Sequence, residues 1–205
     1  QMGIKFDKVR KESDLRQQVP KVLEKIHKFT LEKDGALWFA PQLRHPLRSS
    51  SEGQEGSVGR APDEFLNDRE TVIRKSDGQY TYFASDIVYH FEKFAAGNDL
   101  IVDVLGSNHS GHVPRLQAIV KALGFDTNNF KAILYQWIRL KRGDEIVKMS
   151  KRAGTFVTAK EVIDEVGKDA FRFFLLTPRS QTQLDFDLEL AKKKANENPV
   201  FYVQY

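Results

Sequence analysis

The chain has 205 residues, a length that suits one large domain or one domain with an appendage. It contains no cysteine, which excludes disulfides and thiolate metal sites and favours an intracellular, cytoplasmic location. The formal net charge of +4 is compatible with an anionic partner, and the sequence lacks the apolar run of about 18 residues that a membrane span needs.

The first third of the chain predicts a helix, a strand and a polar insertion. Residues 13–35 place apolar side chains on one helical stripe, namely Val19, Val22, Leu23, Ile26 and Phe29. GALWFA, at 35–40, is typical of a short strand. Residues 41–70 are rich in proline, serine, glycine and charge and show no hydrophobic period. We expect a partly disordered surface insertion there, with a plain linker as the alternative.

Strands and helices alternate in the middle of the chain. TVIRK (71–75) predicts a strand, and the segment after Asp77-Gly78 leads into a helix. DLIVDVLG (99–106) is a continuous apolar run of the kind that parallel sheets bury. An amphipathic helix at 113–125 and a second β-like run at 130–140 follow it. This order describes a βαβ unit, so we predict an α/β fold with a parallel sheet flanked by helices.

The last third predicts a loop followed by helices. Residues 141–157 (KRGDEIVKMSKRAGTFV) are expected to form a loop. Thr158 and Glu161 have capping-box spacing at the start of the next helix. KDAFRFFLLT predicts another helix whose phenylalanines fill the core, and residues 183–198 alternate before becoming helical.

A basic stretch after the second strand is the first candidate site. It contains Lys148, Ser150, Lys151 and Arg152, with Met149 expected to pack beneath them. Developing negative charge on a transferred phosphate needs cations, which lysine supplies as a point charge and arginine as a planar fork. In open α/β sheets ligands lie at the carboxyl ends of strands, where this loop and the one bearing His109 and His112 both fall. A solvated surface run is the alternative.

KMSKR (148–152) resembles the KMSKS-type signature of class I aminoacyl-tRNA synthetases. The longer stretch 147–176, together with DGQYTYFASDIVYH and ANENPVFYVQY, is similar to arginyl-tRNA synthetases. The resemblance runs through about residues 1–40 and 71–205. It implies the second half of a Rossmann-type catalytic domain over 1–187, with the helical anticodon-binding domain beginning at 188–205.

The resemblance also implies roles for single residues. Lys148, Ser150, Lys151 and Arg152 would stabilise the phosphates of ATP. Asp86 and Tyr82 would select arginine, with Tyr89 and His90 as weaker candidates. Gly106, His109, Met149 and the backbone of Val147 would hold ATP. Core packing is the alternative for both tyrosines, and helix N-capping is the alternative for Asp86.

GSNHSGH (106–112) departs from the family pattern, a GADH-like run followed by glycine and tyrosine. Asn108 stands at the position of the aspartate and His112 at that of the tyrosine. His109 and His112 also invite a metal interpretation, but no carboxylate or cysteine in the motif completes a set, so no metal site is predicted. Gln136 either faces the site or is a satisfied polar group beside Trp137, which is expected in the core.

The resemblance implies an arginine–tRNA ligase that forms arginyl-adenylate from ATP and passes arginine to tRNA. Mg²⁺ is expected with ATP, and a monomer without membrane contact is expected. The HIGH-type motif of the family finds no match, so we expect the isolated chain not to activate arginine. A non-catalytic nucleotide- or RNA-binding module derived from a synthetase is the alternative. A generic basic RNA-binding domain ranks last, because it gives Asp86 no purpose.

Overall fold

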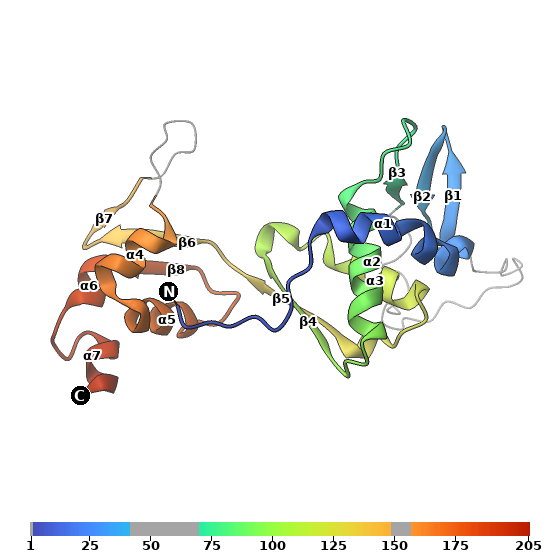
Figure 1. The fold of residues 1–205 in the computed structure, drawn as a ribbon. Coiled ribbons are helices and arrows are strands. Elements are labelled where there is room, and N and C mark those ends of the chain that lie inside the picture. Colours follow the sequence, from blue (N-terminus) through green and yellow to red (C-terminus); the bar gives the residue numbers. More distant parts are fainter. Residues whose placement is uncertain (1, 42–69, 149–156) are drawn as a thin grey trace, which may run out of the picture. The chain divides into compact units, whose positions relative to one another are not determined.

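The computed structural model describes residues 2–41, 70–148 and 157–205 (Figure 1). The predicted insertion at 41–70 therefore lies almost wholly outside the described residues, as do Met149, Ser150, Lys151 and Arg152 of the basic stretch. The chain forms two compact units. One comprises Lys8–Asp103 and His109–Ala132, and the other comprises Val104–Asn108, Ile133–Tyr205 and the N-terminal residues up to Asp7.

The first unit combines an antiparallel sheet with helices. Its helices are α1 (Glu12–Leu23), which continues as the 3-10 helix η1 (Glu24–Phe29), α2 (Tyr82–Ala95) and α3 (Val113–Ala122). Its sheet has the order β1 (Thr30–Lys33), β2 (Ala36–Phe39) and β3 (Thr71–Arg74). Helix α2 contacts α1, α3 and β3, so it is the central element of this unit (Figure 1). The helices predicted after Asp77-Gly78 and at 113–125, and the strands at β2 and β3, are confirmed.

Strand β1 corrects the helix predicted over residues 13–35. The chain turns at Asp34 and Gly35, which both have positive φ, and Lys33 then pairs with Ala36. Two central residues with positive φ are the signature of a type I′ hairpin turn, for which Asp-Gly is a preferred sequence. The helical stripe of the preceding residues masked this local hairpin signal.

The second unit contains a crossover from one strand to a parallel neighbour. Its sheet has the order β7-β6-β8, from β6 (Ile138–Arg142), β7 (Glu145–Ile146) and β8 (Leu184–Asp187). Strands β6 and β8 are parallel, and β6 and β7 are antiparallel. Helices α4 (Ala159–Val166) and α5 (Lys168–Leu176) lie on the connection to β8, and α6 (Leu188–Lys192) and α7 (Pro199–Gln204) follow. A parallel pair requires such a long connection.

The core of the second unit gathers the phenylalanines predicted to pack there. Phe171 and Phe174 of α5 lie against Phe186 of β8, at ring-centroid distances of 5.9 and 5.4 Å. The capping box at the start of α4 is also confirmed. The Thr158 hydroxyl accepts from the Glu161 N–H, and the Glu161 carboxylate accepts from the Thr158 N–H at 2.6 Å.

Two predictions about the later strands need correction. The β-like run at 130–140 is two strands, β5 (Phe130–Tyr135) and β6, interrupted at Gln136 and Trp137. The loop predicted over 141–157 begins as a hairpin, because β6 and β7 pair around Gly143, whose φ is +62°. Glycine reaches this conformation at low cost, so the chain reverses within the charged run.

Strands β4 (Ile101–Gly106) and β5 form a two-stranded sheet. The apolar run predicted the strand β4 correctly. Several of its side chains and those of β5 are nevertheless solvent-exposed, namely Val102, Val104, Ile133 and Tyr135. These strands are therefore not covered on both faces within the described residues, as a central parallel strand would be.

Candidate functional site

Helix α2 presents the two residues predicted to recognise arginine. Its N-cap is Thr81, whose hydroxyl donates to the Val72 carbonyl at 2.7 Å and so ties the helix start to β3. Tyr82 is the first helical residue and Asp86 follows one turn later, so both side chains share one face. Tyr82 is 63% exposed, which rules out the core alternative. Asp86 lies inside the helix, which rules out the N-cap alternative.

The Asp86 carboxylate contacts the side chain of His112. Asp86 Oδ2 lies 3.0 Å from His112 Nε2, and the two side chains are 31% and 14% exposed. His112 is the N-cap residue of α3, so the pair joins α2 to the start of α3. The sequence pattern identified His112 only as a departure from the family and as a doubtful metal ligand. Its role as the neighbour of Asp86 was missed, because 26 residues separate them.

His90 and Tyr89 also lie on α2. His90 Nδ1 contacts the Asp86 carbonyl and Nε2 contacts Asp103 Oδ2, both at 2.8 Å. Both oxygens are acceptors, so each ring nitrogen is committed to a contact within the unit. His90 is buried and is therefore unsuited to a substrate contact. Tyr89 is not a core residue, since it is 37% exposed and lies under the Lys93 ammonium, which is 4.2 Å from the ring centroid.

Asp103 of β4 is the acidic centre of a buried cluster with His90 and Lys93. It accepts from the Lys93 ammonium and contacts His90, and its side chain is only 11% exposed. Burial raises the pKa of Asp103, but hydrogen bonds from His90 and Lys93 outweigh burial and lower the pKa to about 2. The cluster therefore stabilises the contact between α2 and β4.

Replacing Asp103 with asparagine is expected to lower the free energy of unfolding at pH 7 by about 2 kcal/mol, since about 2 pKa units are lost. A carboxylate with a lowered pKa stabilises the fold above its unfolded pKa, near 3.8, and this stability is lost as the pH falls through the folded value of about 2. The difference between Asp103→Asn and wild type should therefore shrink between pH 4 and pH 2. Urea unfolding at pH 7 and at low pH measures it. The exposed Asp99→Asn change is the control, and equal stability of both variants at pH 7 would contradict the expectation.

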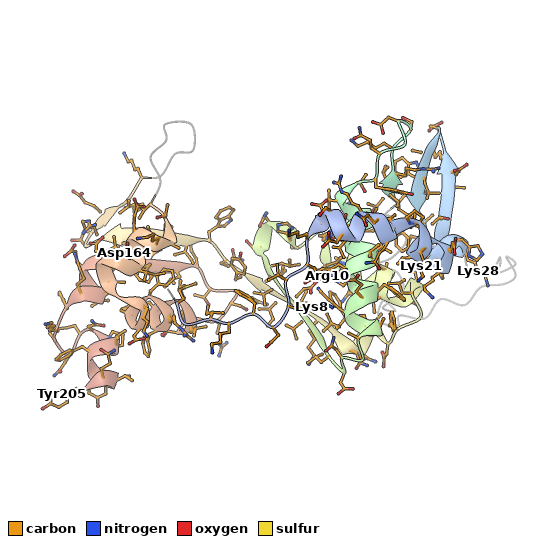
Figure 2. All side chains as sticks on the ribbon, in the orientation of Figure 1. Lys8, Arg10, Lys21, Lys28, Asp164 and Tyr205 are labelled. Carbon is orange, nitrogen blue, oxygen red and sulfur yellow. The ribbon has the colours of Figure 1, made fainter. Side chains whose placement is uncertain are left out.

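A second cluster connects helix α1 and the residues before it to α2. The guanidinium of Arg10 (labelled in Figure 2) donates through Nε to Glu92 Oε2 at 2.8 Å, and Gln18 donates to Oε1 of the same carboxylate at 2.7 Å. The hydrogen bond from Arg10 lowers the pKa of Glu92. Arg10 is thus engaged in the fold of this unit and is not a free cation.

Of the predicted ATP residues that the structure describes, Gly106 and Val147 lie in the second unit and His109 lies in the first. A Cβ added to Gly106, at the end of β4, would lie 2.6 Å from Asn108 Oδ1, so a glycine is needed for the Asn108 amide to approach this closely. A cavity of about 340 Å³ adjoins it, lined by Gly106, Ser107, Asn108, Tyr135, Gln136, Trp137 and Ile138. Trp137 is 70% exposed, so its prediction as a core residue is wrong. Gln136 faces this cavity, while its backbone N–H donates to Ser180 at 2.9 Å.

Of the other two described residues predicted to bind ATP, His109 is exposed and Val147 is partly buried. His109 ends the 3-10 helix η4 (Ser107–His109) and is exposed, and its carbonyl accepts from the His112 N–H at 2.8 Å. The Val147 N–H donates to the Leu140 carbonyl at 2.9 Å, and its side chain packs against the core of the second unit. Because the Val147 N–H is engaged with Leu140, a backbone hydrogen bond from adenine to Val147 would have to use the Val147 carbonyl.

The cations around the β6–β7 hairpin fall into two groups. Arg142 donates to Glu165 and to Glu189, both at 2.7 Å, and Lys192 donates to the same two carboxylates at 2.9 Å. Hydrogen bonds from Arg142 and then Lys192 lower the pKa of Glu165 to about 2. These two cations stabilise the unit itself. Lys148, which follows the hairpin, is exposed and is the described residue of the basic stretch.

Across residues 2–41, 70–148 and 157–205, no group of three or more histidine, cysteine or acidic side chains is placed to hold a metal ion. His109 and His112 are thus not part of such a group. None of the helices in the same residues has the length and apolar content of a membrane span.

The strand–helix arrangement matches known structures closely. A crystal structure from Campylobacter jejuni, assigned provisionally to an arginyl t-RNA synthetase, aligns with a TM-score of 0.82 and 32% identity over 100% of this chain and 41% of that one. Thermus thermophilus arginyl-tRNA synthetase shares the fold at a TM-score of 0.62 and 17% identity, over 95% of this chain and 40% of that one. The fold is therefore that of a class I aminoacyl-tRNA synthetase catalytic domain, which confirms the predicted α/β class.

Residues 52–183, more than half of the chain, match the family model for the catalytic domain of class I tRNA synthetases (R), and the chain belongs to this family. Arginine–tRNA ligase from Syntrophotalea carbinolica is 45% identical over 99% of this chain and 34% of its own length. The corresponding ligase from Citrifermentans bemidjiense is 53% identical over 74% of this chain and 27% of its own length. The chain thus spans about a third or less of the length of these relatives.

Proposed function

We propose that the chain supplies the arginine-selecting and phosphate-binding half of an arginine–tRNA ligase. The parent reaction joins the carboxylate of arginine to the α-phosphate of ATP, releases pyrophosphate and then transfers the arginyl group to tRNA. Residues 1–187 would be the C-terminal half of the catalytic domain and residues 188–205 the start of the anticodon-binding domain. The protein would act in the cytoplasm as a monomer.

The observation that carries the proposal is the Asp86 carboxylate on the Tyr82 face of α2. A guanidinium is a planar cation, so a site that selects it needs a carboxylate in a defined orientation and polar or flat neighbours. Asp86 is partly exposed, one helical turn from an exposed tyrosine, and is fixed by His112 at 3.0 Å. Tyr82 would contribute its hydroxyl or its ring to the same substrate.

The ATP-binding part of the proposal rests on the second unit and on the sequence of the basic stretch. Gly106 and Asn108 adjoin a cavity whose other walls include Tyr135 and Trp137, and flat rings of this kind suit an adenine base. His109 would contact the ribose or the base. Lys148, with Ser150, Lys151 and Arg152, would stabilise the phosphates as pyrophosphate leaves. Met149 and the Val147 carbonyl would contact the nucleotide.

Magnesium would accompany ATP through its phosphate oxygens, since Mg²⁺ is commonly bound by substrate phosphates with one or two carboxylates. The described residues contain no cluster of donors for it, and we assign it no protein ligand. Its chemistry there would be to neutralise phosphate charge.

An exposed apolar cavity supports the proposal that further polypeptide completes the domain. It measures about 370 Å³, and its apolar lining includes Val104, Ile133, Leu175, Leu176 and Pro178. Residues of this kind are normally covered in a finished domain. The alternative, a non-catalytic module derived from a synthetase, would keep the nucleotide-binding residues without any such completion.

Arginine-dependent ATP–pyrophosphate exchange, measured with tRNA present, tests the proposal. The protein translated from the complete gene should show exchange that depends on arginine. The 205-residue chain alone should show none above background, because losing even one charge-stabilising group commonly costs about 10²–10³ in rate. Robust turnover by the isolated chain would overturn the half-site assignment, and no arginine dependence in the complete protein would overturn the proposed function.

A further inference from the structure

Among the described residues of the first unit, His112 has a side chain that contacts both residues proposed to recognise arginine. Its Nε2 lies 3.0 Å from Asp86 Oδ2, and its ring centroid lies 6.0 Å from that of Tyr82. The imidazole also packs edge-on against the buried Phe83 ring of α2, with 6.1 Å between the ring centroids. The imidazole thus contacts two aromatic rings of α2, and its Nε2 lies at the Asp86 carboxylate.

The backbone of His112 is fixed as firmly as its ring. Its N–H donates to the His109 carbonyl at 2.8 Å, and its own carbonyl accepts from Arg115 and Leu116 at 3.0 and 3.1 Å in the first turn of α3. The side chain therefore projects from an ordered helix start, which limits the positions that Nε2 can take. Asp86, by contrast, is a partly exposed side chain on a helix, where its carboxylate could otherwise rotate.

We propose that His112 is a positioning residue for arginine selection, whose Nε2–H donates to Asp86 Oδ2 and so orients the carboxylate toward the substrate guanidinium. This inference rests on the proposed function. The contact uses Oδ2 and leaves Oδ1 outside the pair. A planar guanidinium binds more tightly to a carboxylate of fixed orientation, because the guanidinium donors form a rigid fork. Supporting hydrogen bonds of this kind commonly decide how well a binding group is preorganised.

Two substitutions separate the hydrogen bond from the packing of the ring. His112→Phe keeps an aromatic ring beside Tyr82 and Phe83 but has no donor. His112→Gln keeps an N–H donor at a similar reach but has no ring. If the hydrogen bond positions Asp86, the phenylalanine variant should lose arginine affinity and the glutamine variant should retain it.

The experiment is steady-state pyrophosphate exchange with the complete protein, with arginine and ATP varied separately. His112→Phe should raise KM for arginine about tenfold, the size expected for one hydrogen bond to a charged group. KM for ATP and kcat should change less than about twofold, because the hydrogen bond acts on the substrate-binding carboxylate alone. His112→Gln should stay within about threefold of wild type on every constant.

His27→Phe is the matched control, because His27 lies in η1, is exposed, and its Nδ1 contacts the Glu24 carbonyl at 2.8 Å. The inference fails if His112→Phe leaves KM for arginine unchanged, or if His112→Gln is the more damaging variant, since packing would then be its role. It also fails if KM for arginine and for ATP rise together. A wild-type protein without arginine-dependent exchange would instead mark the failure of the proposed function.

Discussion

Replacing Asp86 with asparagine is expected to raise KM for arginine by about 100-fold, because removing one partner of a hydrogen-bonded charge pair costs about 2–5 kcal/mol. The substitution keeps the shape of the side chain and an oxygen that can accept from His112, 3.0 Å away in the wild type. It removes only the negative charge that would meet the guanidinium. KM for ATP should stay close to its wild-type value, since the predicted ATP residues lie in other segments of the chain.

Arginine-dependent pyrophosphate exchange by the complete protein measures both constants. Asp99→Asn makes the same chemical change at an exposed position and should behave as wild type. If Asp86→Asn leaves KM for arginine within about twofold of wild type, Asp86 is not the carboxylate that selects the substrate.

Replacing Lys151 with alanine is expected to have the opposite kinetic signature. In the complete protein it should lower the rate of adenylate formation by about 10²–10³, the usual effect of removing one group that stabilises developing charge. KM for arginine should change less than about threefold, because a phosphate contact that strengthens in the transition state acts on kcat. Single-turnover formation of arginyl-adenylate in a quenched-flow experiment would measure this rate directly.

The control for Lys151→Ala is Lys160→Ala. Lys160 is an exposed lysine on α4 that pairs with Asp164 one turn away, and such surface pairs contribute little. Similar rates for the Lys151 and Lys160 variants would reject the phosphate role. A larger effect of Lys151→Ala on arginine affinity than on rate would place Lys151 in the amino-acid site instead.

Local sequence patterns determined several elements without reference to the rest of the fold. The Thr158–Glu161 capping box needs only residues three apart, and it forms as expected at the start of α4. The amphipathic pattern at 113–125 likewise predicted α3, which buries Leu116, Ile119 and Val120. The α/β class and the family follow from the same local patterns and from the signature stretches, and the comparisons confirm both.

Predictions that depended on which neighbours a side chain meets were less successful. Trp137 is expected in the core, yet it is exposed and lines a cavity between the end of β5 and the start of β6. The apolar stripe that ends at Phe29 extended the predicted helix over residues 30–33, whereas pairing with β2 makes these four residues a strand. In both cases contacts with other segments outweigh the intrinsic preference of the residues.

The sequence by itself determined the family and the positions of α3, α4 and α5, and it supplied the candidate residues of the arginine and phosphate sites. Only the tertiary structure decided that His112 is the partner of Asp86, that His90 serves the fold through Asp103, and that the Val147 N–H is used within its hairpin. The physical reason is the range of the interactions. Helix stripes and caps are set by neighbours a few residues apart, whereas a contact such as Asp86–His112 exists only once α2 and α3 have packed together.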